Sequence, residues 1–235
     1  APQMHKVVVT GVGCVTSMGL SFNETWNNIL KGYSGVKKHT IEGYSNLPCQ
    51  IAAKIPRTDN NVIDNNDHKA GNPPDPTLFN PKDFIYQNES YYASHCIQYA
   101  LAAAGQAMKD SGLEQYLNDD KLRGKNSIVD RYRIGVAYAS GMGGLEQLES
   151  DYDKLTSDKL KRISPYSIPN MLVNSSGGAI SLRYGLNGPN LAQSTACAAS
   201  AHAIQEGYFL ISSGLADIVV VGGTEAAITP LSIAG

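Results

Sequence analysis

Short apolar runs alternate along this chain with stretches of helical spacing, and this alternation constrains the fold more than any other feature. The apolar runs have the length of buried strands, and two of them end in glycine, where the backbone can turn into the next element. The expected strands span 6–11, 133–139, 191–195 and 217–222, and the expected helices span 23–30, 89–111, 168–184 and 198–212. Strands and helices that alternate in this way indicate an α/β layered fold.

The bulk composition narrows the class of protein. With 235 residues and 42% hydrophobic content, the chain can bury one large core or two small ones. The net charge of −2 and the lack of a known binding motif give no sign of a nucleic-acid partner, and no apolar run is long enough for a membrane span. The four cysteines lack the spacing of a zinc site, so we expect reduced thiols and no metal: Cys14, Cys49, Cys96 and Cys197.

Residues 58–81 interrupt the alternating pattern. They are rich in Asn, Asp and Pro and poor in apolar residues. This composition is typical of a surface segment that buries little of its own side-chain area. We therefore expect a mobile insertion within a single domain that spans 1–235.

Cys197 lies in the stretch QSTACAASAH, residues 193–202, where one thiol is surrounded by Ala and Ser. A predicted strand enters this stretch and a predicted helix leaves it, so we expect the thiol at a helix N-terminus. The partial positive charge there lowers the pKa of a thiol, and the first N–H groups of a helix are free to bond an oxyanion. The small neighbours leave room for a substrate carbonyl, as at a nucleophile elbow. The alternative is a buried structural cysteine in a helix–sheet contact, and the local pattern leaves it open.

Several longer motifs cover nearly the whole chain, and their number and order are more specific than any one of them. They are VVVTGVGCVTSMG (7–19), SGV (34–36), AMKDSGL (107–113), ASGMGG (139–144), KRISPYSIPNMLVN (161–174), GAISLRYGLNGPN (178–190), STACAASAHAI (194–204) and DIVVVGGTEAAITPLSIAG (217–235). Together they resemble the N-terminal half of an elongating β-ketoacyl-ACP synthase, a member of the thiolase-like superfamily.

The resemblance implies a fold, a reaction and a nucleophile. The fold would be the duplicated αβαβα sandwich, and 1–235 would be the N-terminal β-ketoacyl synthase domain with a mixed five-stranded sheet. The reaction would be acyl transfer from an acyl carrier protein to Cys197, followed by decarboxylative Claisen condensation with malonyl carrier protein to give 3-oxoacyl carrier protein. The backbone N–H of Cys197 would supply one oxyanion donor. The family needs no cofactor for catalysis.

The catalytic histidines and lysine of this family belong to its C-terminal half, which we expect to be absent from this chain. His202 follows Cys197 by five residues, and five helical steps of about 100° place it on another face, where we expect a packing or supporting role. Half of a duplicated core would expose its packing face, so we expect residues 1–235 alone to be poorly soluble or to need a partner.

The glycine-rich loop SGMGG, residues 140–144, follows a predicted strand and allows three interpretations. A phosphate cradle and a plain turn are both compatible with its glycines. The resemblance instead places the loop beside an acyl pocket that Leu148 would help to line. Ser167 stands where relatives often carry an aromatic residue, and its small side chain would widen that pocket. The expected substrate-binding residues are Gly141, Met142, Gly143, Leu148, Ser167, Ala196 and Ala198.

Lys161 and Arg162 belong to a small basic cluster. Relatives are basic at this place, so the resemblance implies docking of an acidic acyl carrier protein, with its phosphopantetheine-linked acyl and malonyl groups. The alternative is an ordinary solvated loop. The segment QNESYYAS, residues 87–94, departs from the basic segment of most relatives, and this puts part of the carrier contact in doubt.

The resemblance also bears on assembly and location. Residues 170–184 and 188–195 resemble the dimer-forming region of the family, and we expect a homodimer, with an internal packing helix as the alternative. The stretch YSNLPCQIAAKIPR, residues 44–57, is most similar to mitochondrial members, so we expect the mitochondrial matrix, with a bacterial cytoplasm or a plastid as alternatives.

Two other functions are weighed against a condensing enzyme that acts on carrier-bound substrates. One is a non-catalytic partner subunit of the chain-length-factor type, and the other is a CoA-dependent thiolase-like condensing enzyme. Partner subunits of that type usually lack the cysteine, so Cys197 favours an enzyme.

Overall fold

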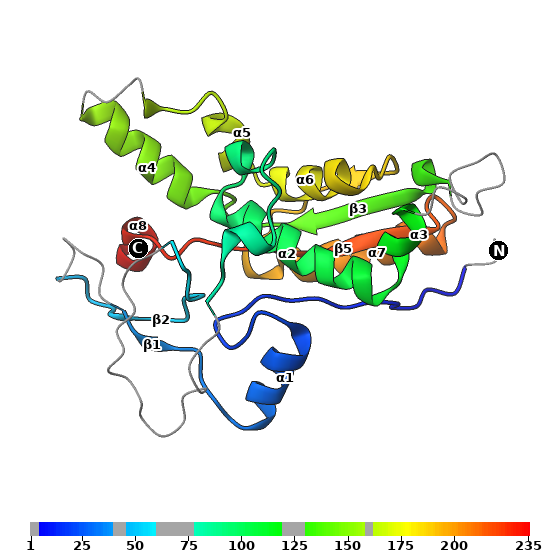
Figure 1. Cartoon of the computed structure of the whole chain (residues 1–235), viewed down its shortest axis with the longest axis horizontal. Helices are drawn as coiled ribbons and strands as arrows, with labels where there is room; N and C mark the ends of the chain where they lie inside the picture. Colours follow the sequence, from blue (N-terminus) through cyan, green and yellow to red (C-terminus); the bar gives the residue numbers. More distant parts are fainter. Residues whose placement is uncertain (1–4, 40–45, 60–77, 119–129, 158–161) are drawn as a thin grey trace.

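In the computed structural model, helices cover both faces of a small parallel sheet (Figure 1). The structure describes residues 5–39, 46–59, 78–118, 130–157 and 162–235. The strands are β1 (Lys37–Lys38), β2 (Ile51–Ala52), β3 (Ile134–Ala139), β4 (Asn190–Leu191) and β5 (Ile218–Gly223). The α-helices are α1 (Phe22–Leu30), α2 (His95–Asp110), α3 (Leu113–Asn118), α4 (Leu145–Thr156), α5 (Ser167–Met171), α6 (Ser175–Tyr184), α7 (Ala199–Ser212) and α8 (Pro230–Ala234).

The fully buried strand β3 is the centre of the main sheet. It pairs in parallel with β4 on one side and with β5 on the other. Ile134 lies opposite Ile218 and Ala139 lies opposite Gly223, so β3 and β5 start and end together. A parallel strand covered on both faces needs apolar side chains on both, which explains the continuous apolar run of β3.

The alternating side chains of β3 face two different helical layers. Ile134, Val136 and Tyr138 pack with α2, α3 and α6 in the largest apolar cluster. The residues between them face α7, whose Ala199 and Ala203 are buried against the sheet. The resulting α–β–α arrangement confirms the α/β layered class that the alternating pattern predicts.

The main sheet differs from the mixed five-stranded sheet that the resemblance implies. In the described part of the chain it has three parallel strands, and β1 and β2 form a separate antiparallel pair. The run 6–11 pairs with no strand among these residues, and its Val8 and Val9 are exposed. This run and the residues that follow it lie beside α2, where a Cβ on Gly11 or Gly13 would lie 2.4 or 2.2 Å from a helix carbonyl oxygen. Its glycines therefore serve close backbone approach to a helix, not a strand-ending turn.

The helix ends follow local sequence signals. α1 begins after Ser21, whose hydroxyl accepts the Glu24 N–H, and α6 ends at Gly185, whose φ of +62° suits glycine. The single helix expected over 168–184 is instead split into α5 and α6, because Leu172 adopts an extended conformation between them. Similarly, the strand expected over 191–195 is shorter than predicted, since β4 ends at Leu191.

The insertion expected over 58–81 lies largely outside the described residues, which resume at residue 78. Near its end, Phe79 is fully buried, stacked on Phe84 and edge-on to Tyr99. The last residues of this segment therefore belong to the packed core, which corrects the boundary drawn from composition.

Candidate active site around Cys197

Cys197 lies in a short 3-10 turn between β4 and α7, and its side chain is exposed. The residue before it, Ala196, has a φ of +52°, in the left-handed region that L residues rarely adopt. The turn is therefore strained, and strain of this kind is found at functional sites where the surrounding structure maintains it. In this chain the thiol is exposed, so it does not have the burial that the alternative of a structural cysteine in a helix–sheet contact expects.

The turn leaves one backbone donor beside the thiol. The N–H of Ala198 bonds Thr195 O at 3.1 Å, and the N–H of Ala199 bonds Ala196 O. The N–H of Cys197 has no acceptor among the described residues. Because α7 begins two residues later, this N–H lies near the positive end of the helix dipole. The geometry suits donation to an oxyanion.

Three chain segments meet near this turn, at the carboxyl edge of the sheet. The hydroxyl of Ser194 donates to Gly141 O at 3.2 Å. The Glu225 Oε2 atom, just beyond β5, accepts the N–H groups of Gly141 and Met142 at 3.0 and 3.1 Å. A Cβ built on Gly141 would lie 3.5 Å from Ala196 Cα. Parallel strands direct their following loops to one edge, and this arrangement gathers the three segments there.

The glycine loop uses its N–H groups within the protein. Besides the two bonds to Glu225, Gly143 donates to Ser140 Oγ at 2.9 Å, and Gly144 donates to Met171 O at 3.2 Å. A phosphate cradle would need these donors free, so that interpretation of the loop is wrong.

The expected substrate-binding residues fall into two regions. Those in the turn and the adjoining loop are Gly141, Met142, Gly143, Ala196 and Ala198. Leu148 and Ser167 belong instead to the arm that α4 and α5 form (Figure 1). Leu148 is exposed and Ser167 is buried. A substrate contact by any of these residues stays a prediction.

Asp151 holds α5 against α4. Its carboxylate accepts hydrogen bonds from Ser167 Oγ, from Lys154 Nζ at 2.6 Å and from Gln147 Nε2 at 2.8 Å. Burial alone raises the pKa of Asp151, but the bonds from Lys154, Ser167 and Gln147 together lower it below its usual value. The hydroxyl of Ser167 is thus engaged with α4, a role that the small-residue argument did not foresee.

A second thiol, Cys96, lies behind the glycine loop and is buried. Its Sγ is 3.6 Å from Ser140 Oγ and 3.7 Å from Ser176 Oγ. Burial raises the pKa of Cys96 to about 11, although the two hydroxyl groups act in the opposite direction. This buried thiol therefore stays protonated at neutral pH.

The sequence reasoning missed Glu225 and the contact between Thr195 and His202. Thr195 Oγ1 lies 2.7 Å from His202 Nδ1, and both residues are exposed, so His202 supports the turn before Cys197 and does not pack inside. Glu225 could have been found, because it follows the predicted strand 217–222 and the carboxyl ends of parallel strands share one edge.

The basic cluster is described only in part. Arg162 is exposed, whereas Lys161 lies outside the described residues. Within the described ranges, no group of three or more His, Cys, Asp or Glu side chains is placed to hold a metal ion. No helix in those ranges is both long and apolar enough to cross a membrane.

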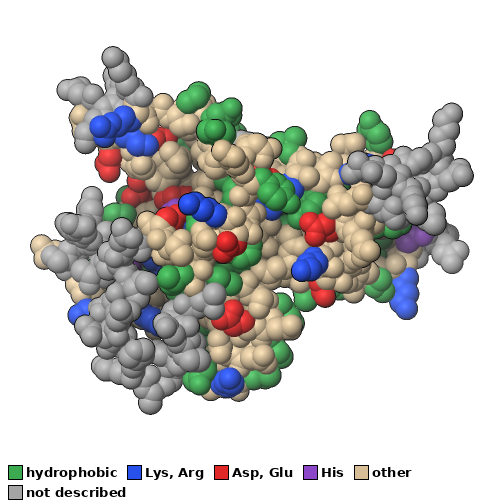
Figure 2. Space-filling model, viewed as in Figure 1, with side chains coloured by type: hydrophobic (Ala, Val, Ile, Leu, Met, Phe, Trp, Pro, Cys, Tyr) green, Lys and Arg blue, Asp and Glu red, His purple; other side chains and the backbone are tan. Residues whose placement is uncertain are grey.

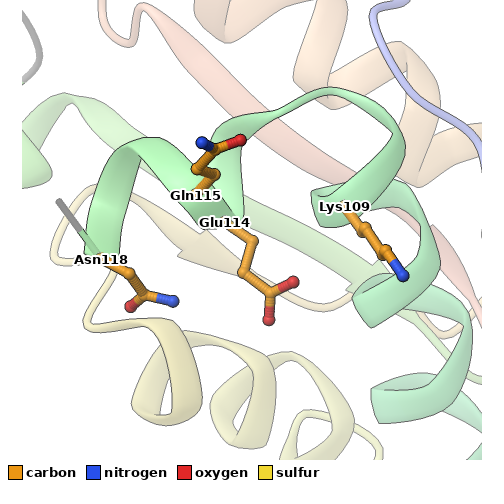
Figure 3. A pocket seen from close by; sticks show the side chains of 4 residues that line it. All are labelled: Lys109, Glu114, Gln115 and Asn118. Carbon is orange, nitrogen blue, oxygen red and sulfur yellow. The ribbon is translucent and has the colours of Figure 1, made fainter.

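A polar depression lies at the opposite edge of the sheet (Figure 3). Lys109 lines it from the end of α2, and Glu114, Gln115 and Asn118 line it from α3. The α3 residue Leu117 accepts a bond from Arg131, just before β3, at 2.9 Å. This places the depression at the amino end of β3, away from Cys197.

Known proteins are similar to the chain in sequence and in fold. A 3-oxoacyl-(acyl-carrier-protein) synthase 2 from Coxiella burnetii is 34% identical over 233 residues, which are 99% of this chain and 49% of that protein. A relative from Schizosaccharomyces pombe, whose name places it among mitochondrial 3-oxoacyl-(acyl-carrier-protein) synthases, is 30% identical over 235 residues, with coverage of 99% and 49%. The crystal structure of a β-ketoacyl synthase from Burkholderia phymatum has a TM-score of 0.75 at 23% identity and covers 98% of this chain and 49% of that one.

The chain spans about half the length of the curated relatives that it matches. The structural likeness confirms the thiolase-like layered fold that the motifs imply. Residues 4–235 match the family model described as "Beta-ketoacyl synthase, N-terminal domain". This chain therefore belongs to the β-ketoacyl synthase family.

Proposed function

We propose that this chain carries the nucleophile of a condensing enzyme of fatty-acid synthesis, a β-ketoacyl-ACP synthase. The observation that carries the proposal is the exposed Cys197 at the N-terminus of α7, with its own N–H unbonded by any described residue. The names of the bacterial and fungal relatives support the same reaction.

In the first step, the Cys197 thiolate attacks the carbonyl carbon of an acyl group on the carrier protein. A new sulfur–carbon bond forms, and the bond from that carbon to the phosphopantetheine sulfur breaks. The departing sulfur takes up a proton and leaves as a thiol. The N–H of Cys197 donates to the carbonyl oxygen while that oxygen carries negative charge.

In the second step, a malonyl group on another carrier protein loses CO₂. The electron pair left on its carbon attacks the acyl carbon on Cys197, a carbon–carbon bond forms, and the Cys197 thiolate leaves. The product is a 3-oxoacyl group two carbons longer on the carrier protein. In the family, histidines and a lysine of the C-terminal half assist this step, and the chain spans about half the length of its curated relatives.

We place the carrier-protein contact at Lys161 and Arg162, and the exposure of Arg162 supports it. We further propose a homodimer that forms through β4. β4 is an edge strand of the main sheet and both of its residues are exposed, so its outer edge offers backbone groups to a second strand. The name of the fungal relative supports a location in the mitochondrial matrix, and the bacterial relative keeps a bacterial cytoplasm as the alternative.

Intact-protein mass spectrometry tests the proposal. The full-length protein, its Cys197→Ser variant and a Cys49→Ser control are incubated with a medium-chain acyl thioester. We expect one acyl adduct on the wild type and on the Cys49→Ser control, and none on Cys197→Ser. Cys49 is a suitable control because it is also an exposed thiol.

Parallel reactions with carrier-bound and CoA thioesters separate the two enzyme classes. Faster acylation from the carrier protein supports the β-ketoacyl-ACP synthase, whereas faster acylation from CoA supports the CoA-dependent enzyme. The absence of any adduct on the full-length wild type would overturn the proposal and favour the non-catalytic partner subunit.

A further inference from the structure

Glu225 joins two segments beside Cys197 that lie far apart in the sequence. Its Oε2 atom accepts the consecutive N–H groups of Gly141 and Met142, 84 and 83 residues earlier in the chain. From the other side, Ser194 Oγ donates to the carbonyl of Gly141. The loop is thus bonded on its N–H side by Glu225 and on its carbonyl side by Ser194, in the segment between β4 and Cys197.

The held loop borders the nucleophile turn. The Cβ position of Gly141 lies 3.5 Å from the Cα of Ala196, the residue before Cys197. The next side chain in the loop, Met142, is 52% exposed and is flexible and apolar. Met142 thus directly follows the glycine that borders the nucleophile turn.

If the N–H groups of Gly141 and Met142 had no partners, the 141–142 loop would be a poor surface for an acyl chain. An apolar chain that covers them removes them from water and offers no acceptor, which disfavours binding. Glu225 supplies that acceptor from within the protein. A longer acyl chain covers more of the loop, so the gain in acyl binding from the Glu225 acceptor grows with chain length.

We propose that Glu225 is a positioning residue that fixes the 141–142 loop as an apolar wall beside Cys197, and that it thereby favours long over short acyl groups. This inference rests on the proposed function, because it requires acylation of Cys197. Glu225 acts through the loop and takes no part in bond making.

The test measures kcat/KM for acylation of Cys197 with an acetyl and with a decanoyl thioester, in the full-length protein. In Glu225→Ala and Glu225→Asp, we expect the decanoyl value to fall about tenfold or more, because the acyl chain would cover N–H groups that have lost their acceptor, and the acetyl value to change much less. Glu225→Gln keeps a side-chain oxygen at the same reach and should restore the decanoyl preference. The rate of Cys197 alkylation by iodoacetamide should not change in any variant.

A matched control removes a similar bond far from the nucleophile. Glu24 Oε2 accepts the backbone N–H of Leu20 at 2.8 Å, at the start of α1. Glu24→Ala should leave the ratio of decanoyl to acetyl acylation unchanged, even if it lowers the stability of the protein.

The other possible results of these experiments would each overturn the inference. Equal losses for both thioesters in the Glu225 variants, or no loss, would overturn the inference while the proposed function stands. If neither Glu225→Ala nor Glu225→Asp folds, the inference is also wrong, because Glu225 then serves stability. If the wild type forms no acyl adduct, the proposed function fails and the inference fails with it.

Discussion

At the scale of single residues, two cysteines near the carboxyl edge of the sheet have opposite environments. Cys197 is exposed in a strained turn, whereas Cys96 is 1% exposed among hydroxyl groups. Cys96 lies in α2 and Cys197 directly precedes α7, and these two helices cover opposite faces of the sheet. Only Cys197 leaves its thiol open to a reactant. The difference is one of burial, which the residue type does not reveal.

We expect iodoacetamide at pH 8 to modify Cys197 and Cys49 in the folded protein and to leave Cys96 intact. Burial raises the pKa of Cys96 to about 11, so about one thiol in a thousand is ionised at pH 8. Mass mapping of peptides after a timed reaction gives the rates. The denatured protein, in which the three thiols should react alike, is the control, and modification of Cys96 as fast as Cys49 in the folded state would contradict the prediction.

At the scale of elements, the contact between α7 and β5 sets where the nucleophile turn lies. Gly207 in α7 is buried, and a Cβ there would lie 2.2 Å from Val221 Cγ1 of β5. The absence of a side chain lets the helix approach the sheet closely. Since Cys197 precedes α7 directly, this contact also fixes the helix end that carries the thiol.

A pair of glycine variants tests the contact. Gly207→Ala should lower the free energy of unfolding by about 1–3 kcal/mol, because overpacking outweighs the gain in helix propensity. Gly178→Ala in α6 should raise it by up to about 1 kcal/mol, since nothing lies within 4 Å of that Cβ position. Urea unfolding followed by circular dichroism measures both values. An equal gain in stability from the two substitutions would show that α7 does not approach β5 so closely.

At the scale of the whole molecule, the described surface exposes many large apolar side chains. On α7, Ile204, Tyr208 and Phe209 are 55%, 44% and 51% exposed, and Val9 in the N-terminal segment is 84% exposed. Figure 2 shows apolar side chains spread over one face, among charged side chains of both signs. Monomeric proteins rarely expose large contiguous apolar patches, so such surface indicates a covering partner or association.

We expect residues 1–235, produced alone, to associate or to bind a hydrophobic dye strongly. Size-exclusion chromatography with light scattering and dye fluorescence measure the two effects. The double variant Ile204→Gln, Phe209→Gln should reduce both, because it removes apolar area from the exposed side of α7. A monodisperse monomer that unfolds cooperatively without binding the dye would contradict the prediction.

The signals that succeeded from sequence alone are local ones. The apolar runs at β3 and β5 depend on residues that are neighbours along the chain, so their pattern is readable without the fold. The helix-start position of Cys197 is local in the same sense. The motifs also identified the family, because their order along the chain can be read from the sequence alone.

Tertiary structure alone decided where those elements touch. The run 6–11 has the composition of a strand, yet it lies beside α2, because a backbone with Gly11 and Gly13 can also approach a helix closely. The hydrogen bond from the Gly141 N–H to Glu225, 84 residues later in the chain, depends on the strand order β4–β3–β5. Local propensity is set by neighbours along the chain, whereas these contacts are set by which surfaces the folded chain brings together.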